Sequence, residues 1–82
     1  MSDTLARIKK VTAQVLKIDP SRIKDDSRFV EDLGAESIQS IELVAAFEEE
    51  FGIEMDEDQA LAVKNIRDAA IFIDKILAEK NK

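Results

Sequence analysis

The chain has 82 residues, of which 45% are hydrophobic, and this suits one small domain with a single core over residues 1–82. It contains no cysteine and no histidine, which excludes disulfides, thiolate metal sites and the commonest general base. Its formal net charge of −6 disfavours nucleic acids and anionic membranes as partners, and it favours proteins with basic patches.

Signals for a membrane or for export are missing from the sequence. No apolar run approaches the roughly 18 residues that span a bilayer. The first residues, MSDTLARIKK, also lack the apolar stretch of a secretory signal. We therefore expect a cytoplasmic protein, and we also expect it to be a monomer.

The first predicted element is a helix over about residues 3–17. Its apolar residues, Ile8 among them, recur at helical spacing, and Pro20 follows shortly after its end. A long connection over about residues 18–36 comes next, and loops of this length are often functional. Four apolar residues are expected to hold this connection against the core: Ile23, Phe29, Val30 and Leu33.

Three further helices are predicted in the second half of the chain. The second covers about residues 37–51 and ends at Gly52. A short third helix covers about residues 56–63, and a fourth covers about residues 66–79. No segment shows the strict alternation of a strand. The predicted fold is all-α: a small four-helix bundle of three longer helices and one short one, with a long loop between helices one and two.

Apolar residues occur on both sides of the predicted second helix. One broad arc should face the core and consists of Leu43, Val44, Phe47 and Phe51. On the other side, Ile38 and Ile41 lie near Glu42. Apolar residues among carboxylates suit a docking surface for a partner with basic residues. They also suit the edge of a wide core stripe, and helical spacing alone leaves both interpretations open.

The segment from Phe29 to Ile38 reads Phe-Val-Glu-Asp-Leu-Gly-Ala-Glu-Ser-Ile and resembles the acyl carrier protein signature. In that signature, a loop ending in Asp-Leu-Gly-Ala leads into Asp-Ser-Leu at a helix start. The segments over residues 41–44 and 47–51 are similar to the rest of the family's second helix. The resemblance covers essentially the whole chain. It implies a four-helix bundle without enzymatic activity, in which Ser37 takes a 4'-phosphopantetheine from coenzyme A.

The chemistry expected at Ser37 agrees with the resemblance. A helix N-terminus offers backbone N–H groups and the positive end of a dipole to a phosphodiester. The residues themselves also allow a plainer role, in which Ser37 is only the N-cap of the second helix. The nearest rival hydroxyl for modification is Ser40.

The resemblance further implies partners, and the residues predict where these partners dock and where the cargo lies. The partners are a phosphopantetheinyl transferase and acyl-processing enzymes with basic docking patches. The predicted docking residues are Glu36, Ile38, Ile41, Glu42, Glu48 and Glu49. The acyl chain is expected to fold back between the second and third helices, against Leu43, Ala46, Phe47, Met55, Ala60 and Val63, with Ile66 deeper.

The sequence departs from the family pattern at several positions. Glu36 stands where Asp is usual, Ile38 replaces Leu, Gln39 is neutral, and Asp56 stands where Pro is common. These departures suggest a specialised carrier and leave the pathway open among fatty acid, lipid and polyketide biosynthesis. Two alternatives remain: a peptidyl carrier, and an acidic helical interaction module without covalent cargo.

Overall fold

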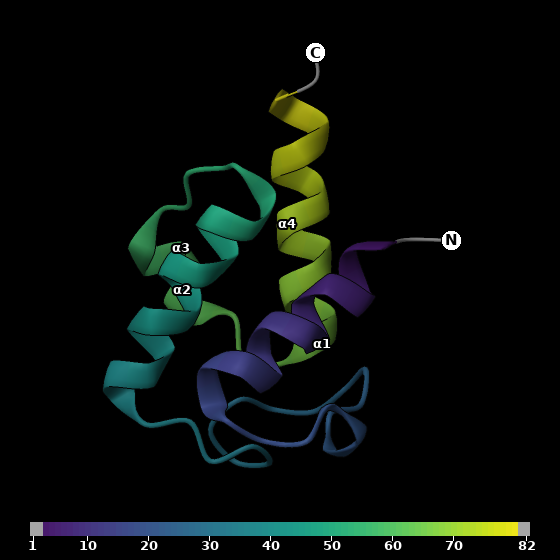
Figure 1. The fold of residues 1–82 in the computed structure, drawn as a ribbon. Coiled ribbons are helices and arrows are strands. Elements are labelled where there is room, and N and C mark those ends of the chain that lie inside the picture. The colour runs from purple at the N-terminus through teal and green to yellow at the C-terminus, as the bar shows by residue number, and fades with distance from the viewer. Residues whose placement is uncertain (1–2, 81–82) are drawn as a thin grey trace.

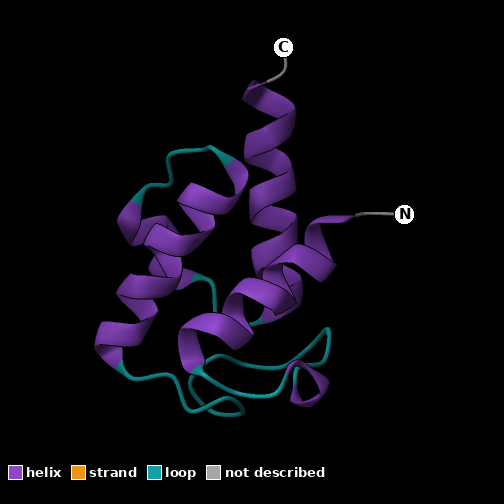
Figure 2. Cartoon of the chain, viewed as in Figure 1, coloured by secondary structure: helices purple, strands orange, loops and turns teal. Residues whose placement is uncertain are grey.

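The computed structural model describes residues 3–80, and their longer elements are helices (Figure 1). In chain order they are α1 (Asp3–Leu16), the 3-10 turn η1 (Pro20–Arg22), α2 (Ser37–Phe51), α3 (Glu57–Ala62) and α4 (Ile66–Lys80). Figure 2 shows these helices joined by loops. Within the described range, the only β-type pairing is one isolated bridge. The predicted small all-α bundle with three longer helices and one short one is therefore confirmed.

The helix ends follow from local chemistry. Helix α1 ends at Leu16, the next residue Lys17 has φ 57°, and the N–H of Ile18 donates to the Ala13 carbonyl at 3.1 Å across this left-handed turn. Helix α2 ends at Phe51, and its C-cap Gly52 has φ 63°, where a glycine carries no steric penalty. The Asp56 carboxylate accepts from the Gln59 N–H and begins α3.

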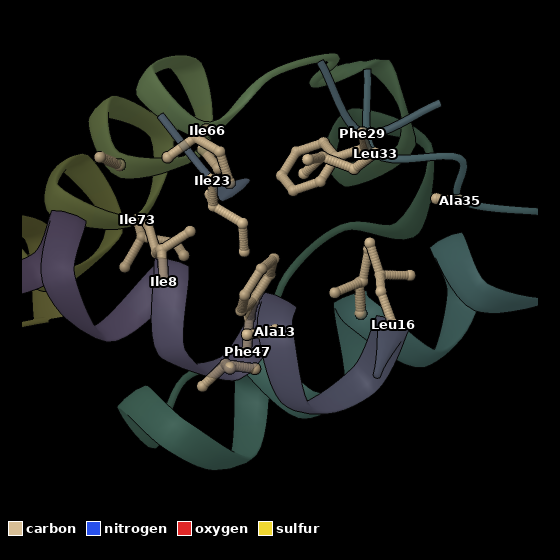
Figure 3. Packing of buried hydrophobic residues seen from close by; sticks show 14 of the residues in the cluster. Ile8, Ala13, Leu16, Ile23, Phe29, Leu33, Ala35, Phe47, Ile66 and Ile73 are labelled. Carbon is tan, nitrogen blue, oxygen red and sulfur yellow. The ribbon is translucent and has the colours of Figure 1, made fainter. Parts of the chain in front are cut away.

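The core lies where α1 packs against both α2 and α4, while α3 packs on α2. The long loop runs below α1 in Figure 1 and closes the open end of the bundle. Figure 3 shows side chains of the loop and of the helices meeting in this core, including Ile8, Ile23, Phe29, Phe47, Ile66 and Ile73. The rings of Phe29 and Phe47 lie 6.4 Å apart at an angle of 53°.

One of the four loop residues expected in the core is not buried. Val30 is 55% exposed, whereas Ile23, Phe29 and Leu33 are buried. Val30 follows directly after Phe29 in a turn, where the Phe29 side chain enters the core and the Val30 side chain stays at the surface. The prediction for Val30 was therefore wrong.

Backbone hydrogen bonds tie the long loop to the connection between α3 and α4. The Phe29 N–H donates to the Lys64 carbonyl at 2.9 Å, and the Ile66 N–H donates to the Ser27 carbonyl at 3.0 Å. The Ala35 N–H in turn donates to the Phe29 carbonyl at 2.8 Å. The loop leading to α2 is thus fixed to the base of α4 by main-chain bonds.

Residues 3–80 contain neither a membrane-spanning helix nor a cluster of metal ligands. No helix in this range is both long and apolar enough to cross a membrane. Nor does the range hold a group of three or more carboxylates placed to bind a metal ion.

Candidate functional site

The start of α2 presents the serine of the signature at the surface. Gly34 has φ 72°, a left-handed conformation that glycine adopts freely, and it turns the chain toward the helix. Glu36 takes the N-cap position, and its backbone N–H donates to the Gln39 side-chain oxygen at 2.9 Å. Ser37 is therefore the first residue inside the helix, not its N-cap. The interpretation of Ser37 as only an N-cap was wrong.

The two hydroxyls of the first turn differ in availability. Ser37 is exposed, and within the described residues its hydroxyl makes no hydrogen bond. Ser40 is half-buried, and its hydroxyl donates to the Glu36 carbonyl at 3.3 Å. Ser37 is thus the hydroxyl that an external enzyme can reach without breaking an internal bond.

A cavity of about 290 Å³ opens beside Ser37 and extends between α2, α3 and α4. Such a volume lies at the lower end for ligand pockets, which suits a narrow apolar group. Its lining consists of Phe29, Val30, Ser37, Ser40, Ile41, Leu43, Val44, Phe47, Met55, Ala60, Leu61, Val63, Lys64, Ala69 and Phe72. Serine hydroxyls and one lysine are the polar side chains among these residues.

The structure brings most of the predicted pocket residues together. Those that line the cavity are Leu43, Phe47, Met55, Ala60 and Val63. Ala46 and Ile66 do not line it, contrary to expectation. Ala46 packs half-buried against the core, and Ile66 is fully buried in that core at the start of α4.

Several lining residues were missed by sequence reasoning. Phe29 and Val30 come from the long loop, Lys64 from the connection before α4, and Phe72 from α4 itself. Helical periodicity places residues on faces, but it does not show that the loop is bonded to Lys64 across the bundle. No local signal could have found these positions.

The predicted docking residues fall into two groups. Ile38 and Ile41 are 67% and 51% exposed, so the interpretation of both as core residues was wrong. Glu36, Glu42 and Glu49 are exposed near them on the outer surface of α2. Glu48 differs: it is half-buried, and its carboxylate accepts from the Met55 N–H at 2.8 Å. Glu48 therefore anchors the α2–α3 connection.

An acidic residue of the signature has a structural role in the loop. The Asp32 carboxylate pairs with the Arg28 guanidinium at 3.0 Å and accepts the Arg28 backbone N–H at 2.8 Å. These bonds, first the one from the side chain and then the one from the backbone, hold the pKa of Asp32 below its ordinary value. Asp32 therefore stays ionised and stabilises the turn before Ser37, and the Arg28 guanidinium is engaged in this ion pair.

A protein-family model matches most of the chain, including the start of α2. A family model described as a phosphopantetheine attachment site matches residues 6–73, from α1 into α4. Proteins of this family carry a covalently attached 4'-phosphopantetheine, and an exposed hydroxyl beside an apolar cavity fits such a group. The chain therefore belongs to the phosphopantetheine-attachment family, as a carrier protein of the acyl carrier protein family whose covalent cofactor is 4'-phosphopantetheine.

Proposed function

We propose that the chain is a single carrier domain over residues 1–82, that Ser37 is its attachment residue, and that its cargo is an acyl group. The observation that supports this most directly is the position of Ser37. It is the first residue of α2, it is exposed, its hydroxyl makes no hydrogen bond in the described residues, and it lines the cavity. The protein itself is not an enzyme in this proposal.

Attachment is a phosphoryl transfer carried out by a separate transferase. The Ser37 oxygen forms a bond to the phosphorus of coenzyme A that carries the pantetheine. The bond to the adenosine bisphosphate leaving group breaks, and the hydroxyl proton passes to a base of the transferase. The backbone N–H groups and dipole at the start of α2 favour the resulting phosphodiester. The attached group supplies a terminal thiol, which holds the cargo as a thioester.

The lining of the cavity favours acyl over peptidyl cargo. Leu43, Phe47 and Met55 present apolar side chains, and each methylene buried among them contributes about 0.8 kcal/mol. A peptide would bring amide groups into this space, and a buried amide without partners costs about 1–3 kcal/mol by protein mutational data. Acyl intermediates of fatty acid, lipid or polyketide biosynthesis are the cargo that this space suits.

The outer surface of α2 is the proposed docking face for the transferase and for acyl-processing enzymes. Ile38 and Ile41 supply exposed apolar contacts, and Glu36, Glu42 and Glu49 surround them with negative charge. Partners with basic rims would be attracted over a distance and would bury the isoleucines on contact. A monomeric carrier in the cytoplasm fits this mode of action.

The attachment residue is tested by mass. Apo protein is incubated with coenzyme A, magnesium and a broad-specificity phosphopantetheinyl transferase, and its intact mass is measured. Wild type should gain one phosphopantetheine, and Ser37→Ala should gain none. Ser40→Ala is the matched control and should be modified like wild type, because its hydroxyl bonds to the helix backbone. Modification of Ser37→Ala, or a wild type that is never modified, would refute the proposal.

A further inference from the structure

Lys64 is the one charged residue among those that line the cavity beside Ser37. It is exposed, and its ammonium makes no ion pair or hydrogen bond within residues 3–80. The rest of the lining is apolar except for the two serine hydroxyls. The cavity thus has an apolar interior and one available cation.

The backbone of Lys64 is held in a fixed relation to the start of α2. The Lys64 carbonyl accepts from the Phe29 N–H at 2.9 Å, and the Phe29 carbonyl accepts from the Ala35 N–H at 2.8 Å. Ala35 lies two residues before Ser37 and is buried. Two consecutive main-chain bonds therefore connect the lysine to the segment that positions the serine.

The charges around Ser37 are otherwise unfavourable to an added anion. Glu36 precedes it and Glu42 follows on the same helix, both exposed. The nearby Arg28 is already paired with Asp32. A phosphodiester on Ser37 adds negative charge to a protein with a formal net charge of −6, so Lys64 is the cation left to oppose it on the cavity side.

We propose that the Lys64 ammonium pairs with the phosphodiester on Ser37 and draws the phosphopantetheine arm toward the cavity. The inference rests on the proposed attachment at Ser37 and assigns a positioning role to Lys64. An arm held on this side carries its cargo inward, between α2 and α3, whereas a released arm lies along the outer surface of α2. Lys64 therefore shifts the equilibrium between acyl cargo held in the cavity and acyl cargo exposed to partner enzymes.

The test measures how often the thioester is exposed. Holo protein is loaded with a neutral, saturated, medium-length acyl chain, and cleavage of the thioester by hydroxylamine is followed by intact mass. Exposed ion pairs contribute about 0.2–1 kcal/mol, so Lys64→Met should speed cleavage about 1.4- to 5-fold. Lys64→Arg should stay near wild type. Lys75→Met is the charge-matched control, because Lys75 is exposed on α4 and does not line the cavity.

A second readout reports on the phosphorus directly. The ³¹P chemical shift of the phosphodiester should move in Lys64→Met and stay in place in Lys75→Met. Added salt should shrink the difference, since the Debye length falls to about 3 Å at 1 M.

The outcomes separate this inference from the proposed function. Suppose that wild type accepts the arm and protects its thioester, and that Lys64→Met has the same cleavage rate and ³¹P shift. This result would overturn the role of Lys64 and leave attachment at Ser37 intact. An effect of Lys64→Met seen only with cargo that ends in a carboxylate would also overturn this role, because Lys64 would then pair with the cargo and not with the phosphodiester. Failure of wild type to accept the arm would refute the proposed function itself.

Discussion

Two threonines of α1 show how differently a buried hydroxyl can be placed. Thr4 is buried, and its hydroxyl donates to the Asp74 carboxylate of α4 at 2.5 Å. Thr12 is fully buried, and its hydroxyl has no hydrogen-bond partner. A buried polar group without a partner loses its bonds to water and gains nothing in return. Removing the Thr12 hydroxyl is therefore expected to stabilise the fold.

Replacing Thr12 with valine should stabilise the protein. Valine has nearly the same shape, and the change removes an unsatisfied hydroxyl whose burial costs about 1–3 kcal/mol. The free energy of unfolding, from urea denaturation, should rise by about that amount.

Thr4→Val is the matched control for this prediction. It removes a hydroxyl that does have a partner, Asp74, so the free energy of unfolding should fall. A Thr12→Val protein that is less stable than wild type would show that the Thr12 hydroxyl is satisfied after all.

At the scale of elements, α2 combines a structural and an interaction surface. Phe47 and Phe51 face the core, and the Arg7 guanidinium stacks over the Phe51 ring at 4.4 Å while it bonds to Glu50. Arg7 thereby fastens α1 to the end of α2. On the outer side, Ile38 remains exposed, and Ile41, which also lines the cavity, is half exposed. The same helix thus holds the bundle together and keeps an apolar surface free.

Glu48 and Glu49 are neighbours in α2 with different expected roles. Glu48 accepts the Met55 N–H at 2.8 Å, and hydrogen bonds to charged groups contribute about 1.5–3 kcal/mol. Because Glu48 is only half-buried, Glu48→Ala should lower the free energy of unfolding by about 1–2 kcal/mol and speed amide exchange in α3. Both quantities can be measured by denaturation and hydrogen exchange.

Glu49→Ala is the matched substitution at an exposed position. It should change stability by less than about 0.5 kcal/mol. It should instead slow association with the transferase at low salt, because rim charges act mainly on the association rate. Equal loss of stability in both variants would contradict the assignment of Glu48 to the α2–α3 connection.

The sequence predicts the elements better than it predicts the contacts between them. The bounds of α2 follow from its N-cap Glu36 and its C-cap Gly52, and the start of α3 follows from Asp56, since caps and glycines act locally. The exposure of Val30 and the place of Lys64 in the cavity depend on bonds between the loop and the segment before α4. Those bonds join residues far apart in the chain, and hydrophobic periodicity carries no information on them.

At the scale of the whole molecule, the cavity lies beside the shortest α-helix of the bundle. Helix α3 has six residues and packs on α2, and Glu48 anchors the connection before it. Small side chains, Ala60 of α3 and Ala69 of α4, leave space between the longer helices. A short helix over such a space can shift at low cost, because it buries little apolar surface of its own. The fold thus combines a hydrogen-bonded loop before Ser37 with a short helix, α3, that can shift on the other side of the cavity.

An acyl chain on the arm should raise the melting temperature of the folded carrier. Burial of the chain occurs only in the folded state, and a group that interacts with the folded state alone stabilises it. In a domain of this size, a net gain of about 1 kcal/mol raises the Tm by roughly 4–8 °C. Calorimetry of the holo form and of a form carrying a medium-length saturated chain should therefore show a higher Tm for the acylated form.

Narrowing the cavity should reduce this gain. Ala60→Phe places a large ring in the lining, so the Tm difference between acyl and holo forms of that variant should be smaller than in wild type. Comparing the two forms within one variant cancels the effect of the substitution on the bundle itself. Ala45→Phe is the control, because Ala45 is exposed on α2 and does not line the cavity, and its acyl–holo difference should equal that of wild type. Equal Tm values for the holo and acyl forms of wild type, with unshifted amide signals for Leu43 and Phe47, would show that the chain stays in solvent.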